Sequence, residues 1–331
     1  MNKILTLITL WCVLISPAFS AAECDNQIKG INLAGLGFAP AQLPGVLGKH
    51  YHFPSPEHYA YYAGIGFNAV RLSVIWERWQ PKLFEALDPG YNQLIEGAFL
   101  HARQYGLNVV IDLHNYHRYR GQHIGTEKVP VSAYIDAWLR ISRKFSKYDN
   151  LLAYGLMNEP HGTLGQWENH AQAVVSAIRA KGDATMLYIA GDHWSNSYFW
   201  SKQHKKSFIQ DPMNRFKYEA HLYVDNNSSG TYKDLDLSFF TKLEERVKKR
   251  LQPFVQWLKK ENSQGVIGEF GIPNEDKWLP SLQAFLEQSK IDCLDWYMWS
   301  GGAWSSGYEL SLQPVKGIEK RQILLIRNFI N

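Results

Sequence analysis

Val266-Ile267-Gly268-Glu269-Phe270-Gly271 is a short apolar run that carries a single carboxylate near its end. Buried parallel strands are continuous apolar segments of about five residues, so this run predicts a strand with Glu269 at its carboxyl end. A second apolar run, residues 151–157, leads into Asn158-Glu159 and is stopped by Pro160. Two strands are therefore expected to deliver two glutamates to one edge of a sheet. Either glutamate alone is as readily a solvated strand end, so the pair is the informative observation.

Eight strand-like segments alternate with helical segments along the chain, and no Ser/Pro/Thr-rich linker separates them. The strands are predicted at residues 28–33, 67–74, 107–114, 151–157, 185–190, 217–223, 266–269 and 293–299. The helices are predicted at residues 55–63, 91–105, 132–145, 167–180, 237–261, 278–288 and 319–329. This repetition favours an α/β fold, a single (β/α)8 TIM barrel over residues 22–331. The alternative is a doubly wound sheet, which would want a phosphate loop that Leu33-Ala34-Gly35-Leu36-Gly37 matches only in part.

Residues 1–21 are typical of a secretory signal peptide. Lys3 supplies the positive charge, residues 4–15 the apolar core, and Ala18-Phe19-Ser20 or Ser20-Ala21-Ala22 the small-residue cleavage site. The apolar core is too short to span a bilayer comfortably, and no later stretch is long enough. We therefore expect a secreted protein, extracellular or periplasmic, with no membrane segment after cleavage. An uncleaved membrane anchor is the alternative.

The amino-acid composition limits the kinds of molecule that the protein is expected to bind. The 331 residues carry a formal net charge of +4, which falls to +3 when the signal peptide and its one lysine are removed. The basic residues are scattered except for a helical cluster at residues 242–250, which Glu244 and Glu245 interrupt, so nucleic acid is not expected as a partner. The 12 Trp and 18 Tyr exceed what a core explains, and carbohydrate sites use such rings to pack against sugars. A monomer is expected.

Two cysteines remain after the signal peptide, because Cys12 lies inside it. Cys24 lies eight residues before Asn32, at the end of the first strand, and Cys293 lies six residues before Trp299, at the end of the last. The first and last strands of a closed barrel are neighbours, so both thiols would lie at its amino-terminal rim. Export makes a disulfide between Cys24 and Cys293 chemically possible, and we predict one; two free thiols are the alternative.

Polar and aromatic side chains gather at the carboxyl ends of the predicted strands, where (β/α)8 barrels build their active sites. They are Arg71, His114, Asn158, Glu159, His221, Tyr223, Glu269 and Trp299. The histidines are separated and no cysteine joins them, so no metal or cofactor is predicted, although two His and a Glu remain a possible zinc ligand set. A Gly-x-Ser-x-Gly nucleophile elbow is also missing from the sequence. Two carboxylates remain, which is the pair that glycoside hydrolysis needs.

These residues, in this order and on these strands, resemble glycoside hydrolase family 5. The segments 112–116 (DLHNY), 155–161 (GLMNEPH), 221–225 (HLYVD) with 229–231 (SGT), and 299–304 (WSGGAW) look like the endo-β-1,4-glucanases, or cellulases, of that family. The resemblance covers essentially the whole chain after the signal peptide. It rests on eight separate positions, of which any single one would be moderate support.

The resemblance implies a retaining double displacement on a β-glucan polysaccharide. Glu159 would be the acid/base and Glu269 the nucleophile, with their carboxyl groups about 5–5.5 Å apart. Arg71 and Tyr223 would keep Glu269 ionised and oriented, by charge and by hydrogen bond. His221 would orient Glu159, and the negative charge of Glu269 would keep Glu159 protonated until Glu269 is consumed.

The resemblance also gives three residues contacts with the sugar at the cleavage position. Asn158 would contact the 2-hydroxyl, His114 would bind the sugar, and Trp299 would lie beneath it. Aromatic rings that directly follow strand ends are interpreted as platforms in an open cleft, although some of them are expected to be packing residues. They are Trp76, Trp79, Tyr116, Trp194 and Trp304. The polar loop 225–233 is long enough to form one wall of that cleft.

Departures from the family pattern bear on the substrate. His193 stands where relatives often have Asn, and Ser300 where they often have Ala, so neighbouring subsites are expected to differ. No binding module or linker is attached, so soluble or amorphous glucan is expected rather than crystalline cellulose. One alternative is a related β-glycanase acting on mannan, mixed-linkage glucan, xyloglucan or β-1,3-glucan. Another is a non-catalytic carbohydrate-binding barrel, against which two mutually repelling carboxylates argue.

Overall fold

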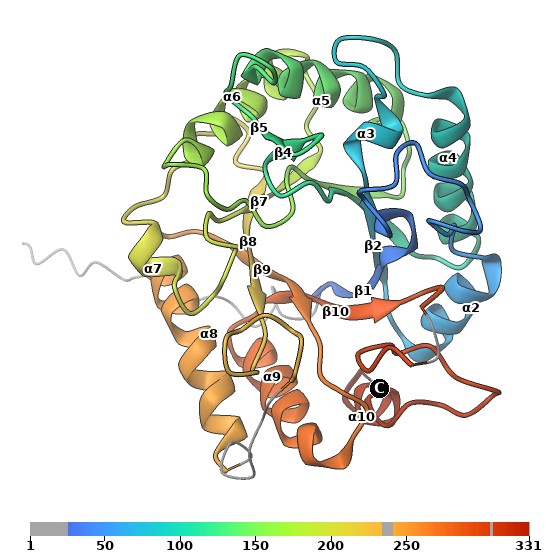
Figure 1. Cartoon of the computed structure of the whole chain (residues 1–331). Helices are drawn as coiled ribbons and strands as arrows, with labels where there is room; N and C mark the ends of the chain where they lie inside the picture. The colour runs from blue at the N-terminus through green and yellow to red at the C-terminus, as the bar shows by residue number, and fades with distance from the viewer. Residues whose placement is uncertain (1–25, 234–240, 305–306, 331) are drawn as a thin grey trace, which may run out of the picture.

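The computed structural model describes residues 26–233, 241–304 and 307–330. Eight parallel strands close into a barrel in the order β1-β2-β3-β6-β7-β8-β9-β10, and helices surround it on the outside (Figure 1). The strands are β1 (Lys29–Leu33), β2 (Ala69–Val74), β3 (Asn108–Leu113), β6 (Leu151–Gly155), β7 (Met186–Ala190), β8 (Phe216–Leu222), β9 (Gly265–Phe270) and β10 (Asp295–Gly301). The fold is therefore the predicted (β/α)8 barrel.

Long helices cover the outside of the barrel between successive strands. They are α2 (Pro56–Ile65), α4 (Pro89–Gln104), α5 (Val131–Phe145), α6 (Trp167–Ala180), α8 (Leu243–Lys260), α9 (Leu279–Ile291) and α10 (Arg321–Ile330). All begin and end within a few residues of the predicted helices, except that α8 starts later than residue 237. Residues 234–240 lie outside the described part of the chain.

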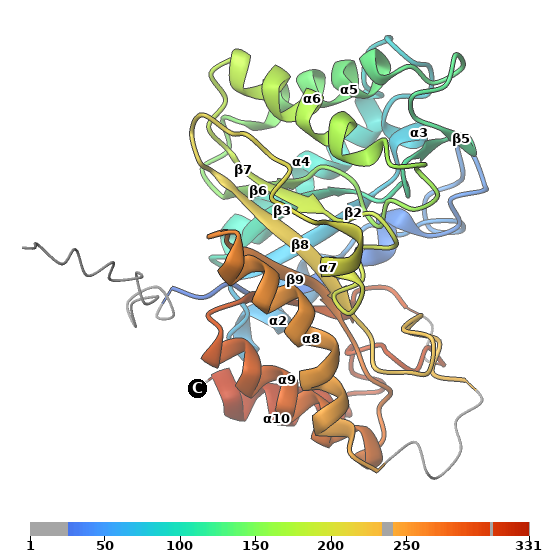
Figure 2. The same cartoon turned by 90° about the vertical axis from the view of Figure 1, so that its left-hand side faces the viewer.

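The rim at the carboxyl ends of the strands also contains short elements that the sequence pattern does not predict. They are η1 (Ala34–Gly37), α3 (Trp76–Trp79), the hairpin of β4 (Arg118–Tyr119) and β5 (Gln122–His123), α7 (Trp200–Gln203) and η3 (Asp276–Trp278). Figure 2 shows the barrel from the side, with the β4–β5 hairpin and the loops of this rim at the right. Elements of two to four residues have no periodicity to detect, which is why pattern analysis misses them.

Two of the sequence predictions fall largely outside the described residues. The proposed signal peptide, residues 1–21, and Cys24 both lie there, so the disulfide with Cys293 stays a prediction. Cys293 itself lies just before β10, at the end of the barrel where its strands begin. Over the described ranges, none of the helices combines the length and apolarity required to cross a membrane.

The interior of the barrel changes from apolar to polar along the strands. Near the amino ends, six buried side chains fill it: Ala69, Val110, Ala153, Tyr188, Val266 and Tyr297. Alternate residues of a strand face the same side, so Arg71 is the next inward position on β2 after Ala69. Arg71 is fully buried, and carboxylates surround it. The apolar layer thus forms the floor on which a charged layer rests.

A bulge in β9 decides where Glu269 points. Between Ile267 and Phe270, β9 has one residue more than β8 and β10 have between the residues that pair with them. With regular alternation, Val266 and Gly268 would face inward and Glu269 would face the helices. The extra residue lets Glu269 turn into the barrel mouth as well. Gly268 is required at this point, because a Cβ there would lie 1.9 Å from Oε1 of Glu219.

Gly268→Ala is therefore expected to destabilise the fold and to displace Glu269. Overpacking of this kind typically costs about 1–3 kcal/mol of unfolding free energy. If Glu269 is the nucleophile that the sequence predicts, its displacement should also cost about a hundredfold in hydrolysis rate. Urea unfolding and hydrolysis rates measure the two effects. The matched control is Gly64→Ala in α2, where a Cβ meets nothing within 4 Å. Equal behaviour of the two variants would contradict the role assigned to the bulge.

Candidate active site

Arg71 is the centre of the charged layer. Its Nη2 lies 2.8 Å from Oδ1 of Asp112, its Nε 3.0 Å from Oε1 of Glu219, and its Nη1 3.2 Å from Oε1 of Glu269. Nη2 also donates a 2.9 Å hydrogen bond to Oδ1 of Asn158. Burial opposes the charge on Arg71, but Asp112, Glu219 and Glu269 outweigh burial and raise its pKa above the usual value. One guanidinium therefore contacts and orients three carboxylates.

Glu269 is held from two sides. Arg71 contacts one of its carboxylate oxygens, and the hydroxyl of Tyr223 donates a 2.7 Å hydrogen bond to the other. Burial and the nearby Glu159 raise the pKa of Glu269, while His221 and Arg71 act against that rise. The expectation that Arg71 and Tyr223 keep Glu269 ionised is thus incomplete, because burial opposes them and the charge of His221 is needed as well.

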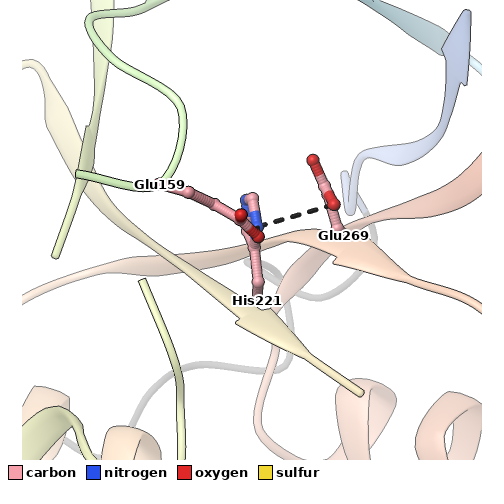
Figure 3. Close-up of side chains that lie close together, drawn as sticks. All are labelled: Glu159, His221 and Glu269. Carbon is pink, nitrogen blue, oxygen red and sulfur yellow. Dashed lines mark hydrogen bonds and ion pairs between the residues drawn. The ribbon is translucent and has the colours of Figure 1, made fainter. Parts of the chain in front are cut away.

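His221 lies between the two glutamates (Figure 3). Its Nδ1 is 2.8 Å from Oε1 of Glu159 and 3.6 Å from Oε2 of Glu269. Its Nε2 lies 3.5 Å from Oε1 of Glu219, below it in the barrel. Burial lowers the pKa of His221, but Glu269 and the hydrogen bonds to Glu159 and Glu219 overcome this and raise it to about 10. His221 is therefore an imidazolium at neutral pH, which allows two carboxylates to share a small buried volume.

A second set of contacts arranges the side chains beside the glutamates. Nδ1 of His114 lies 2.7 Å from Oδ2 of Asp112, and its Nε2 lies 3.3 Å from Nδ2 of Asn158. A carboxylate can only accept, so His114 carries a proton on Nδ1 and presents Nε2 as an acceptor to Asn158. The ring of His114 is stacked against Trp299, with centroids 5.8 Å apart. Nε1 of Trp299 donates to the hydroxyl of Tyr308 at 2.8 Å, which fixes the plane of the indole.

Two hollows meet at Glu159 and form one cleft. The larger has a volume of about 820 Å³, and its walls include His114, Tyr116, Asn158, Glu269, Trp299 and Tyr308. The smaller, of about 490 Å³, is bordered by His193, Trp194, Phe199, His221 and Asn227. Glu159, Tyr223 and Ser229 border both. As predicted, the loop 225–233 contributes to the cleft wall. The cleft thus extends to both sides of the paired glutamates.

The aromatic platforms predicted from the sequence divide into cleft residues and packing residues. Tyr116 and Trp194 line the cleft, and Trp194 is 48% exposed. The prediction for Trp76 is wrong: it is buried in the core, donates to Gln80 and packs against Tyr119, as the short helix α3 turns it inward. Trp79 is buried as well.

Trp304 occupies an intermediate position, half-buried beside the cleft. It stacks on Tyr308, a wall residue of the larger hollow, with ring centroids 3.9 Å apart. On the other side its ring lies 4.3 Å from that of Phe38. Trp304 therefore supports the wall through Tyr308.

Sequence reasoning missed four polar residues that organise the site: Asn32, Asp112, Glu219 and Tyr308. Asp112 and Glu219 precede His114 and His221 by two residues, which places each pair on the same side of its strand. A polar residue two positions before a predicted site residue on a strand therefore indicates a buried partner of that residue. Asn32 donates to the main-chain carbonyls of Gly268 and Met298 and accepts from Arg71, so it ties β1 to the bulge.

One group of side chains among the described residues has donor atoms close enough to hold a metal ion. It consists of Glu159, His221 and Glu269, whose ligand atoms lie within 4.8 Å of one another. The same three atoms are already joined by hydrogen bonds and ion pairs, and Arg71 supplies a permanent positive charge beside them. The three side chains therefore already satisfy one another, as two carboxylates bridged by an imidazolium.

A known protein family matches this chain over most of its length. The family model described as cellulase, glycosyl hydrolase family 5, matches residues 23–304. The chain belongs to glycosyl hydrolase family 5. As a member of this family it is a glycoside hydrolase, and the catalytic machinery of the family has to be sought in the cleft described above.

Relatives in family 5 match nearly the full length of this chain. Endo-β-1,4-glucanase B of Emericella nidulans is 27% identical over 323 residues, which cover 92% of this chain and 94% of the relative. The solved structure of Pseudomonas stutzeri endoglucanase Cel5A in complex with cellobiose is 36% identical with a TM-score of 0.86, and the match covers 91% of this chain and 92% of that one. An endo-β-1,4-glucanase from Xanthomonas axonopodis pv. citri is 33% identical with a TM-score of 0.85 and coverage of 91% and 97%.

Proposed function

We propose that this family 5 glycoside hydrolase is a retaining endo-β-1,4-glucanase that cuts soluble or amorphous β-glucan. The observation that carries the proposal is the pair Glu159 and Glu269, with oxygens within 4.8 Å of each other and His221 between them. Inverting enzymes separate their carboxyl groups by about 6.5–9.5 Å to admit a water molecule, whereas retaining enzymes keep them about 5–5.5 Å apart. The close pair supports a double displacement.

Glu269 is the proposed nucleophile. Its carboxylate is fixed by Arg71 and Tyr223, so one oxygen can attack the anomeric carbon without a large entropic cost of orientation. The hydroxyl of Tyr223 and the charge of His221 stabilise the ionised form that has to attack. Attack forms a glycosyl ester on Glu269 and expels the leaving sugar.

Glu159 is the proposed acid/base. In the first step Glu159, as the carboxylic acid of the pair, protonates the leaving oxygen while the ionised Glu269 attacks. Once Glu269 is esterified its charge is gone, and Glu159 can take a proton from the incoming water. The 2.8 Å contact with His221 orients Glu159 for both steps. The water then releases the sugar with its original anomeric configuration.

The larger hollow fits the sugar that becomes attached to Glu269. Trp299 offers a flat apolar face against which a glucose ring can pack, and its tilt is fixed by His114 and Tyr308. Asn158, held by Arg71, is placed to contact the 2-hydroxyl. The smaller hollow, with Trp194, then receives the leaving part of the chain. Because substrate can extend in both directions, internal bonds are the expected target.

The names of the relatives support the β-1,4-glucan substrate. The Emericella nidulans relative is named an endo-β-1,4-glucanase, and the Pseudomonas stutzeri endoglucanase was solved with cellobiose. We further propose that residues 1–21 direct export and that Cys24 pairs with Cys293. These two proposals rest on the sequence and on the place of Cys293 at the start of β10.

The experiment compares reducing-sugar release with loss of viscosity on carboxymethylcellulose, mixed-linkage glucan and mannan. An endo-β-1,4-glucanase cuts internal bonds, so viscosity should fall steeply on carboxymethylcellulose while few reducing ends are formed. Activity confined to mannan would preserve the mechanism and overturn the substrate. No hydrolysis of any of the three would overturn the proposed function.

A further inference from the structure

Arg118, in β4, lies between two histidines close to the smaller hollow. Its Nη1 is 2.9 Å from Nε2 of His161, and its Nη2 is 3.1 Å from Nε2 of His123. A guanidinium can only donate hydrogen bonds, so both Nε2 atoms have to be unprotonated acceptors. His161 and His123 are therefore neutral and carry their protons on Nδ1.

These two assignments determine the state of two further histidines. The Nδ1–H of His123 points to Nδ1 of His117 at 3.4 Å, which makes that nitrogen an acceptor and places the proton of His117 on Nε2. Nε2 of His117 in turn lies 2.9 Å from Nδ1 of His170, which accepts. All four histidines are thus neutral with defined tautomers. An added proton on any of these accepting nitrogens removes one hydrogen bond, and on His161 or His123 it places a second cation next to Arg118.

The network holds parts of the cleft. The ring of His161 is stacked on Trp194 with centroids 4.5 Å apart and planes at 12°, and its Nδ1–H donates to the main-chain carbonyl of Glu159 at 3.1 Å. Arg118 also donates to the carbonyl of Tyr116 at 2.7 Å, so it connects the loop after β3 to the loop after β6. Glu159 has a φ of +43°, which a non-glycine residue adopts only when its surroundings impose it.

We propose that Arg118 is a positioning residue that fixes Trp194 and the main chain of Glu159 through neutral histidines, so that acidification weakens the leaving-group side of the cleft. The proposal rests on the proposed function in one respect, since it takes the hollow with Trp194 to receive the leaving part of the substrate. It adds a pH dependence that acts on substrate contact and is separate from the titration of Glu159 and Glu269.

The surroundings of the four histidines favour their neutral forms near pH 7. Burial lowers the pKa of His161, His123 and His170, and burial together with the neighbouring histidines and Arg118 lowers that of His117 to about 3. Two carboxylates act in the opposite sense: Asp192 faces His161 and His123, and Glu159 faces His161. The folded pKa values stay below the ordinary 6.5, so the network is complete above that pH and is lost as the pH falls through the folded values.

The first test uses no substrate. Two-bond ¹H–¹⁵N spectra of the imidazoles at pH 7.5 should show the Nδ1–H form for His161 and His123 and the Nε2–H form for His117. Titration should protonate His161 below pH 6.5. An Nε2–H form of His161, or its protonation at or above pH 6.5, would overturn the proposal whether or not the protein hydrolyses glucan.

The second test compares two substrates at pH 7 and at a pH below the His161 midpoint that the titration gives. Cellohexaose reaches across Trp194, whereas an aryl β-cellobioside with a good leaving group ends just beyond the cleaved bond. In the wild type, kcat/KM for cellohexaose should fall about three- to tenfold relative to the aryl substrate as the pH drops, the size of one aromatic contact. The change should lie mainly in KM.

Two variants and one control test whether the pH dependence comes from this network. His161→Gln keeps an acceptor for Arg118 but cannot be protonated, so its ratio should not vary with pH. Arg118→Lys cannot bridge two imidazoles, so its ratio should be low at both pH values. Arg120→Lys makes the same change on the same hairpin outside the network and should behave like the wild type. A wild-type ratio that is constant with pH, or one that varies equally in His161→Gln, would refute the proposal.

Discussion

Glu269→Ala is expected to lower kcat by about four orders of magnitude or more while the fold is retained. The carboxylate of Glu269 is the proposed nucleophile, so without it no glycosyl ester can form on the enzyme. The fold should tolerate the change, because one buried carboxylate that repels Glu159 disappears and Arg71 keeps two others. Steady-state kinetics on an aryl β-cellobioside and a thermal unfolding curve measure the two effects.

Azide distinguishes the two glutamates. In Glu269→Ala an azide ion can occupy the space of the lost carboxylate, attack the anomeric carbon once and expel the leaving group, which gives an α-glycosyl azide. In the matched variant Glu159→Ala, azide attacks the ester on Glu269 from the opposite side, which gives a β-glycosyl azide. The anomeric coupling constant in the proton spectrum identifies the product. A β-azide from Glu269→Ala, or near-normal turnover by that variant without azide, would refute the assignment of the nucleophile.

Arg71→Met is expected to cost about 3–5 kcal/mol of unfolding free energy at neutral pH, as well as activity. The substitution leaves Asp112, Glu219 and Glu269 buried without their shared cation. In the wild type, burial raises the pKa of Glu219 but Arg71 and His221 outweigh it, and the net shift is downward. A lowered carboxyl pKa stabilises the fold above its unfolded value, and this contribution is lost as the pH falls. Without Arg71 it is missing at high pH.

The difference in unfolding free energy between wild type and Arg71→Met should therefore be larger at pH 7 than at pH 4, because the ordinary glutamate pKa of 4.5 lies between these two values. Urea unfolding at the two pH values measures it. Arg103→Met is the control, because the ion pair of Arg103 with Asp149 is exposed and screened by solvent, so its loss should have little effect. If Arg71→Met were no more destabilising than this control, the carboxylates would have to be neutral in the folded protein.

Most of the fold could be predicted because most strands are short apolar runs and most long helices carry a periodic apolar face. The positions of the site residues followed from the same runs, since the strands end where the polar residues begin. Trp76 shows the limit of that reasoning: a four-residue helix after β2 turns it into the core, and no pattern in four residues indicates such a turn. The two-residue spacing of Asp112 and His114 indicates that both side chains face the same side of their strand. The apolar pattern alone marks Asp112 only as part of a strand.

The orientation of Glu269 was the part that alternation could not supply. A strict period of two, counted from Val266, directs Glu269 towards the helices, and only the pairing with β8 and β10 reveals the extra residue. The network of Arg118 and four histidines was equally hidden, because its residues come from three separate segments and meet only in the folded chain.

The bulge in β9 also bears on how such barrels change over time and how they can be redesigned. If β9 kept strict alternation through Gly268, it would look better by every rule of regular sheets. The carboxylate of Glu269 would then face the helical shell. The proposed catalysis therefore depends on an irregularity in strand pairing as well as on residue identity, and a barrel of this sequence idealised for regularity would lose activity.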